Sequence, residues 1–182
     1  MNQQVRLWPT PEAYLAAMRP DHPVLFFSAA ALRAVHDAFR AGFPGLVTYA
    51  VKANPDARVL RVLADAGMGA FDVASVAEIE AVRAVCPGAV LHYNNPVRSR
   101  DEIAAALRAG VRSFAVDRSG ELEKLAALAP ADCEVSVRFK LPVAGAAYDF
   151  GAKFGADPAE AAALMRRGGA ARATVSLAFH PA

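Results

Sequence analysis

Residues 48–55 read Thr-Tyr-Ala-Val-Lys-Ala-Asn-Pro, an apolar run that ends in a lysine and then turns. Similar runs recur along the chain, and amphipathic stretches separate them. The six runs are 46–51, 70–74, 89–93, 113–116, 135–139 and 174–179. Because they are largely continuous in hydrophobicity, they are typical of strands covered on both faces, as in a parallel sheet.

Helix-capping signals stand between these runs. Each signal is a Ser or Asp whose side-chain oxygen can accept from a free N–H group of the first helical turn, followed by an acidic residue. The pairs are Ser75 with Glu78, Ser99 with Glu102, and Asp157 with Glu160. Two earlier helices are expected over 10–18 and 28–41. The chain therefore predicts repeated strand–helix units.

Repeated units on parallel strands fit either a doubly wound open sheet or a (β/α)₈ barrel. A doubly wound nucleotide binder has a glycine-rich turn after its first strand, where this chain has 51–55, Val-Lys-Ala-Asn-Pro. A lysine at the carboxyl end of a strand fits a barrel, whose active sites lie on that face. A full barrel has eight strands and about 250 residues, whereas this chain has 182 residues and six clear runs, or seven with 24–27. We expect an α/β fold, a (β/α)₈ TIM barrel truncated to about six or seven strands.

Composition excludes several classes of protein. Hydrophobic residues make up 55% of the chain and charged residues 21%, which is typical of a folded core rather than disorder. The 20 basic and 18 acidic residues are interspersed, so no basic stripe predicts a nucleic-acid partner. No apolar run is long enough for a membrane span, and residues 1–11 do not resemble a secretory signal. Cys86 and Cys133 lack metal-binding spacing and are interpreted as thiols of a reducing compartment, so we expect a cytoplasmic protein without metal.

Lys52 is the first candidate for chemistry. Its amine would project from a strand end into a partly desolvated mouth, where burial favours the neutral amine that can form a Schiff base. A lysine after a strand is more often a solvated or snorkelling residue. The other motifs of the chain decide between these interpretations.

These motifs resemble those of the fold-type III pyridoxal-phosphate decarboxylases, the family of the ornithine, diaminopimelate and arginine decarboxylases. Residues 49–54 are similar to the lysine motif of that family, and further matches follow in the same order. They lie at 69–79, 93–99, 114–122, 137–139, 153–156 and 179–180. Seven matches in one order are far more specific than any single one. The resemblance implies an N-terminal barrel domain that binds pyridoxal 5′-phosphate, closest to that of ornithine decarboxylase.

The resemblance also implies the roles of four residues. Lys52 would form the Schiff base with the cofactor and act as acid and base after decarboxylation. His180 would stack on the pyridine ring. Asp72 and Arg138 would line the cofactor pocket and orient the lysine and the ring substituents.

Three of these residues have simpler interpretations when each is taken alone. Asp72 could cap the turn that follows its strand. Arg138 could pair with a local carboxylate such as Glu134 or Asp132, because a buried guanidinium needs an anionic or aromatic partner. His180 could be an ordinary residue near the end of the chain.

The family pattern breaks at 179–182, Phe-His-Pro-Ala, where the family has a serine soon after the histidine. The glycine-rich loop that binds the cofactor phosphate and the C-terminal β-domain would lie beyond this point. We therefore expect residues 1–182 to be the N-terminal barrel part of a longer decarboxylase. The resemblance implies a homodimer with shared active sites for the full-length form.

The first functional hypothesis is decarboxylation of L-ornithine to putrescine, in polyamine biosynthesis. Diaminopimelate, lysine and arginine are alternative substrates, because specificity is read from segments beyond residue 182. A second hypothesis is a non-catalytic barrel homologue that binds or regulates partners. A single-domain cofactor carrier ranks last because its lysine segment differs. Alanine racemase is disfavoured because 55–57 read Pro-Asp-Ala where Tyr-Gly-His is usual.

Overall fold

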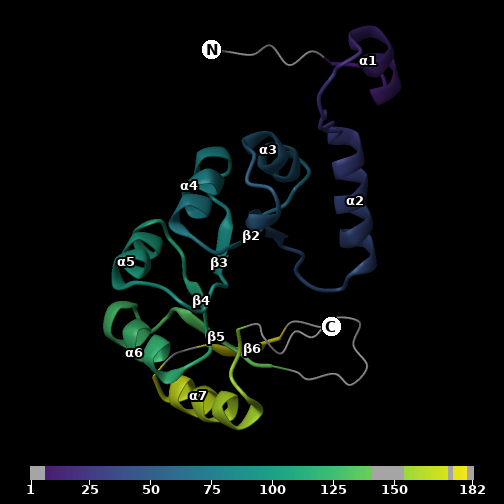
Figure 1. Ribbon diagram of the computed structural model, residues 1–182. Coiled ribbons are helices and arrows are strands. Elements are labelled where there is room, and N and C mark those ends of the chain that lie inside the picture. The colour runs from purple at the N-terminus through teal and green to yellow at the C-terminus, as the bar shows by residue number, and fades with distance from the viewer. Residues whose placement is uncertain (1–6, 141–153, 172–173, 180–182) are drawn as a thin grey trace.

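A computed structural model describes residues 7–140, 154–171 and 174–179 (Figure 1). Six parallel strands form one sheet, and their order in the sheet repeats their order in the chain. The strands are β1 (Tyr49–Ala50), β2 (Ala70–Val73), β3 (Val90–Tyr93), β4 (Ser113–Val116), β5 (Glu134–Arg138) and β6 (Val175–Ala178). A doubly wound sheet reverses its strand order at a switch point, and this sheet does not. The predicted α/β class with parallel strands is confirmed.

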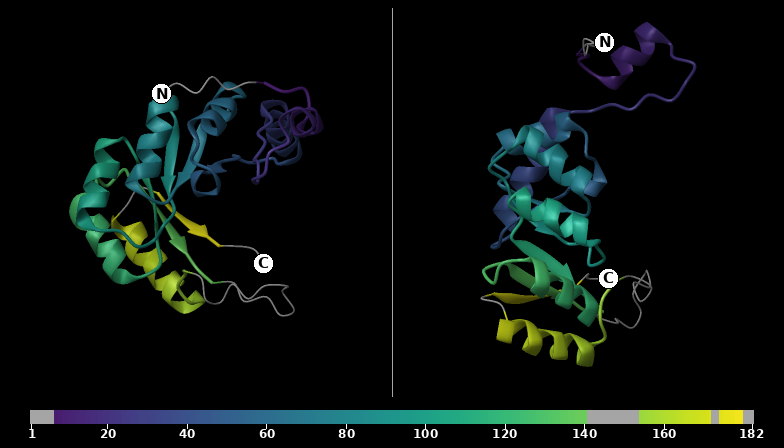
Figure 2. Two further views of the ribbon diagram at one scale, coloured as in Figure 1. Left: turned by 45° about the horizontal axis from the view of Figure 1, so that its top comes forward. Right: turned by 90° about the vertical axis from the view of Figure 1, so that its left-hand side faces the viewer.

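Helices cover one face of the curved sheet, and α1 lies apart from it (Figures 1 and 2). The helices are α1 (Pro11–Met18), α2 (Ala29–Gly42), α3 (Ala57–Asp65), α4 (Val76–Val85), α5 (Arg100–Arg108), α6 (Ser119–Leu128) and α7 (Pro158–Ala171). Both early helices are confirmed, and α5 begins with the predicted capping box of Ser99 and Glu102. No helix in the described ranges is long and apolar enough to cross a membrane.

The first strand is shorter than the apolar run 46–51 predicts. Only Tyr49 and Ala50 pair with β2, and Leu46 is exposed. Lys52 therefore lies two residues beyond the strand, on a short 3₁₀ turn, η1 (Val51–Ala53). The seventh strand considered for 24–27 is wrong: these residues precede α2 without pairing to the sheet. An apolar run forms a strand only where a neighbouring strand offers it hydrogen bonds.

The two faces of the sheet differ in side-chain chemistry. Large apolar side chains alternate along the strands on the face that packs on the helices, and they are buried: Phe71, Val73, Leu91, Tyr93, Phe114, Val116, Val135 and Val137. The strand register places small or polar residues together on the other face, with Asp72 beside His92 and His92 beside Ser113. Helices thus cover only one face of the described sheet, and the polar face is left for a site.

Candidate active site

A pocket of about 460 Å³ lies at the carboxyl ends of the strands. Its volume is within the range of small-molecule sites, and its place is where ligands bind in parallel α/β folds. Most of the lining residues lie in or near the ends of the six strands, and Glu78 of α4 and Phe154, which precedes α7, complete the set: Ala50, Lys52, Asp72, Ala74, Glu78, Asn94, Asn95, Ala115, Arg138, Phe154, Ala178 and Phe179. The sheet therefore brings residues from distant parts of the chain to one place.

Three of the four residues predicted for the site line this pocket. They are Lys52, Asp72 and Arg138, which come from η1, β2 and β5. Their separation in sequence is large, and parallel strand ends are what unites them. His180 lies outside the described residues.

Lys52 lies on a turn held in shape by polar contacts. The Tyr49 hydroxyl donates to the Asn54 carbonyl at 3.3 Å, and Asn54 Oδ1 accepts from the Asp56 N–H at 3.0 Å. Lys52 itself is exposed. The predicted desolvation of its amine is therefore not provided by the described residues, because the amine stands beyond the end of a short edge strand.

Asp72 is half-buried on β2. Burial raises the pKa of its carboxyl, and the nearby Lys52 ammonium and a hydrogen bond with Asn94 offset part of that effect. The Glu78 carboxylate adds a smaller upward contribution to the same pKa. Asp72 thus interacts with Asn94, which follows the neighbouring strand β3. This contact differs from the alternative in which Asp72 caps the turn after its own strand.

Arg138 ends β5 and is half-buried. Within the described residues it forms no ion pair with Glu134 or Asp132. Glu134 accepts a hydrogen bond from Ser176 Oγ at 2.7 Å instead. The Arg138 guanidinium is therefore a cation in the pocket wall, suited to an anionic ligand group.

Several lining residues were not predicted from the sequence. Glu78 was expected to complete a capping box with Ser75, but its Oε2 accepts from the Ala74 N–H at 2.9 Å. Ser75 Oγ does cap α4, accepting from the Glu78 N–H at 3.3 Å. Asparagine is common in turns, and nothing more was expected of Asn95. Its side chain nevertheless donates a hydrogen bond to the Ala74 carbonyl at 3.4 Å. The position of Asn95 soon after β3 was the available signal for it, whereas Glu78 lies in the first turn of α4.

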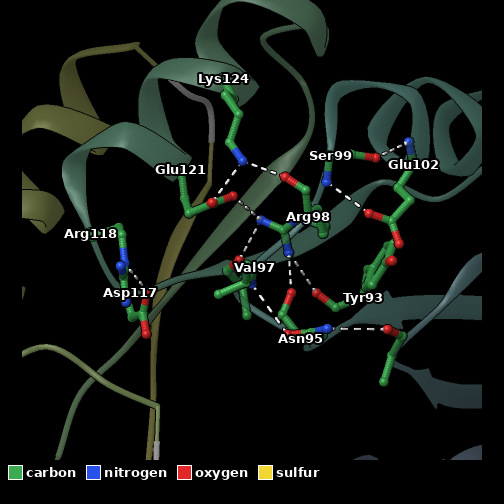
Figure 3. Close-up of polar contacts among 12 residues, drawn as sticks. Tyr93, Asn95, Val97, Arg98, Ser99, Glu102, Asp117, Arg118, Glu121 and Lys124 are labelled. Carbon is green, nitrogen blue, oxygen red and sulfur yellow. Dashed lines mark hydrogen bonds and ion pairs between the residues drawn. The ribbon is translucent and has the colours of Figure 1, made fainter.

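A cluster of polar contacts surrounds Arg98, whose side chain is buried (Figure 3). The Arg98 side chain is 0% exposed and forms an ion pair with Glu121 at 4.0 Å. Lys124 Nζ lies 2.7 Å from Glu121 Oε1 and also donates to the Arg98 carbonyl. The matched segments 93–99 and 114–122 contain Arg98 and Glu121, but the sequence did not predict that the two side chains meet.

Comparison with protein families gives one match over most of the chain. Residues 29–180 match the family described as "Pyridoxal-dependent decarboxylase, pyridoxal binding domain". An ornithine decarboxylase of Panagrellus redivivus is 39% identical over 134 residues, which are 72% of this chain and 30% of that protein. A lysine/ornithine decarboxylase of Selenomonas ruminantium is 38% identical over 122 residues, 66% of this chain and 30% of that protein.

Solved structures that are similar to this chain include decarboxylases as well. The arginine decarboxylase of Paramecium bursaria Chlorella virus matches with a TM-score of 0.81 and 26% identity, over 93% of this chain and 46% of that one. A lysine/ornithine decarboxylase from Vibrio vulnificus, complexed with putrescine, matches with a TM-score of 0.77 and 28% identity, over 94% of this chain and 44% of that one. The chain thus spans less than half the length of the relatives it matches.

Proposed function

This chain belongs to the pyridoxal-dependent decarboxylases, as their pyridoxal-binding domain, and from that premise we propose that it is the N-terminal barrel part of an amino-acid decarboxylase. The cofactor of this family is pyridoxal 5′-phosphate. The observation that supports the proposal most is the convergence of Lys52, Asp72 and Arg138 on one pocket at the carboxyl ends of the strands.

The donors in the pocket fit this cofactor. Lys52 supplies the primary amine that a pyridoxal aldehyde requires. Arg138 supplies a cation for an anionic substituent, and Phe154 and Phe179 supply aromatic surface. His180 stays a proposal for stacking on the ring.

The reaction would divide between the cofactor and this chain. When bound, pyridoxal phosphate supplies an electron sink for the electron pair that remains on the substrate carbon as its bond to the carboxylate breaks and carbon dioxide leaves. Lys52 would hold the cofactor covalently and then return a proton from its ammonium to that carbon. Asp72 would attract the Lys52 side chain electrostatically and so help to orient it.

We propose a basic amino acid as the substrate, with L-ornithine, giving putrescine for polyamine biosynthesis, as the first choice. The ornithine decarboxylase of Panagrellus redivivus supports this choice by its similarity. Lysine, arginine and diaminopimelate remain alternatives, since relatives with these names match too. A homodimer with shared active sites and a cytoplasmic location stay predictions. A non-catalytic homologue is the weaker hypothesis, because it would not require the three site residues to meet.

Borohydride trapping tests the cofactor site. The protein that carries this chain is mixed with pyridoxal phosphate, reduced with borohydride and digested, and the labelled peptide is identified by mass spectrometry. Label on Lys52 that disappears in Lys52→Ala is expected, with Lys124, Lys140 and Lys153 as internal controls. Absence of label, or label spread over all four lysines, would contradict the proposal.

Product analysis then tests the reaction. The protein that carries this chain is incubated with L-ornithine, L-lysine, L-arginine and meso-diaminopimelate, and the amine product and carbon dioxide are measured. Putrescine from ornithine is expected, with loss of turnover in Lys52→Ala. Normal turnover by Lys52→Ala would overturn the catalytic role of Lys52.

A further inference from the structure

Arg98 joins the carboxyl ends of β3 and β4 through backbone carbonyl groups. Its Nη1 donates to the carbonyls of Asn95 at 2.6 Å and Tyr93 at 3.4 Å, and its Nη2 donates to the Ala115 carbonyl at 2.6 Å. A planar guanidinium can serve several acceptors in fixed directions, which a single ammonium cannot do equally well. The side chain therefore sets the spacing between the two strand ends.

Two of these carbonyls belong to residues of the pocket wall. Asn95 and Ala115 both line the pocket, while Arg98 itself is not among its lining residues. The Asn95 side chain in turn contacts the end of β2, because it donates a hydrogen bond to the carbonyl of Ala74, another lining residue. One buried side chain thus links three wall residues from three neighbouring strands.

Keeping this guanidinium buried is energetically costly, and the surroundings show how it is stabilised. Its carbon Cζ lies 5.3 Å from the ring centre of Tyr93 and 5.5 Å from that of Phe114, at cation–π distance. Burial lowers the pKa of Arg98, and the Glu121 carboxylate gives the largest opposing contribution. Glu121 is in turn held by Lys124 (Figure 3). An apolar side chain would fill this space without the desolvation cost, so the contacts to the wall carbonyls are what the arginine adds.

We propose that Arg98 is a positioning residue of the ligand pocket, holding the ends of β3 and β4 at the spacing that shapes the wall around Asn95 and Ala115. This inference rests on the proposed function for the identity of the ligand, pyridoxal phosphate. It adds to that function a residue that acts on the pocket without lining it.

Arg83, on α4, provides a matched control, because its contacts lie near the amino end of β3. Its Nε donates to the Ala109 carbonyl at 2.9 Å, and its Nη1 donates to the carbonyls of Pro87 at 2.9 Å and Ala89 at 2.6 Å. None of these acceptor residues lines the pocket. Arg83 therefore makes the same kind of three-carbonyl contact without a place near the ligand.

The test compares Arg98→Met with Arg83→Met in the protein that carries this chain. Pyridoxal phosphate affinity is measured by absorbance titration, and thermal stability is measured without the cofactor. Arg98→Met is expected to weaken binding by about tenfold to a hundredfold, as misplaced supporting groups do. Arg83→Met is expected to lower Tm and leave the affinity within about twofold, because its contacts support the scaffold alone. Arg98→Lys, which restores one donor, is expected to recover part of the affinity.

Amide hydrogen exchange adds a readout that does not depend on the cofactor. Arg98→Met and Arg98→Lys should speed exchange in residues 93–97 and 113–117, whereas Arg83→Met should not. Arg98→Lys keeps the charge and the alkyl chain, so it tests the proposal even if the methionine variant does not fold.

Two outcomes would overturn the inference. One is unchanged cofactor affinity and unchanged exchange in both Arg98 variants. The other is an equal loss of affinity in Arg83→Met, which would reduce Arg98 to a general contributor to stability. If the unaltered protein takes no label at Lys52, the proposed function fails and the pocket role falls with it. If Lys52 is labelled while the Arg98 variants bind normally, only the role of Arg98 is lost.

Discussion

Asp72 lies beside Lys52 at the ends of the first two strands, and burial outweighs the lysine charge in setting the pKa of the Asp72 carboxyl, which is raised. The pair is therefore unlike an exposed ion pair, in which the carboxyl pKa falls. The desolvated carboxylate by itself destabilises the native state, and any cation in the pocket reduces that destabilisation. This balance has a measurable consequence for stability.

Asp72→Asn is expected to increase the free energy of unfolding at pH 7. The native pKa is above the ordinary 3.8, so between these two values the native state binds more protons than the unfolded state. Stability of the unaltered protein therefore falls as pH rises through that window, and the asparagine variant avoids the fall. Urea unfolding from pH 3.5 to pH 7 measures the difference, which should vanish at the acid end. Asp132→Asn, at an exposed position, is the control. The expectation would be refuted if the stability difference between Asp72→Asn and the unaltered protein were no larger at pH 7 than at pH 3.5.

Asp56→Ala is expected to destabilise the protein by about 1 kcal/mol at pH 7, the usual cost of losing a helix N-cap. Asp56 Oδ1 accepts from the Arg58 N–H at 2.8 Å at the start of α3, just after the lysine turn. Hydrogen bonds from the Arg58 side chain and backbone lower the Asp56 pKa to about 2. The carboxylate therefore stabilises the native state above pH 3.8, and this contribution is lost as pH falls toward 2.

Arg58→Met separates the cap of Asp56 from its ion pair. It keeps the backbone N–H and removes the guanidinium, so it should cost less than Asp56→Ala, because exposed ion pairs contribute little to stability. Chemical denaturation of both variants at pH 7 and pH 3 gives the comparison. An equal cost for the two variants would mean that the ion pair, and not the cap, stabilises α3.

Gly155→Ala is expected to destabilise the protein by about 1–3 kcal/mol, the range for a strained backbone position. Gly155 has φ +142°, and an added Cβ would lie 2.9 Å from the carbonyl carbon of Phe139. Its N–H also donates to Asp117 Oδ2 at 3.2 Å, next to Phe154 of the pocket. Gly169→Ala is the opposite control: nothing crowds a Cβ inside α7, so a gain of about 0.5–1 kcal/mol is expected. Thermal unfolding of both variants should show shifts of opposite sign.

Phe114→Leu is expected to cost more stability than Phe71→Leu. Both phenyl rings are fully buried, on the two strands that flank β3, so the loss of apolar packing is similar. Only Phe114 also lies against the Arg98 guanidinium, and a desolvated cation–π contact is worth about 2 kcal/mol. Equal unfolding free energies for the two variants would show that the ring contact contributes nothing.

Local signals in the sequence were enough to locate most strands and helices. Strand β4 coincides with its apolar run at 113–116, and Ser99 with Glu102 forms the expected capping box. These features depend on neighbours a few residues away, which a sequence displays directly. The extent of β1 and the absence of a strand at 24–27 depend on pairing with other segments, which hydrophobicity alone does not reveal.

The candidate site was predictable only to the extent that motifs marked it. Lys52, Asp72 and Arg138 were chosen by resemblance, and parallel strands bring them together. Arg98 lies in the matched segment 93–99, but its contacts could not be predicted, because its hydrogen-bond acceptors are backbone carbonyls and any residue type can provide a carbonyl. The exposure of Lys52 was also missed, since a strand-end lysine gives no indication of what covers it.

The match between strand order and chain order bears on how the molecule assembles during synthesis. Each strand pairs with the strand made just before it, so a nascent chain can extend the sheet one unit at a time as it leaves the ribosome. Among the described strands, none pairs with a strand distant in the sequence, which keeps the entropy cost of loop closure low and favours fast folding. Stepwise shortening from the carboxyl-terminal side should therefore remove β6 and then β5 while the pairing of β1 to β4 persists.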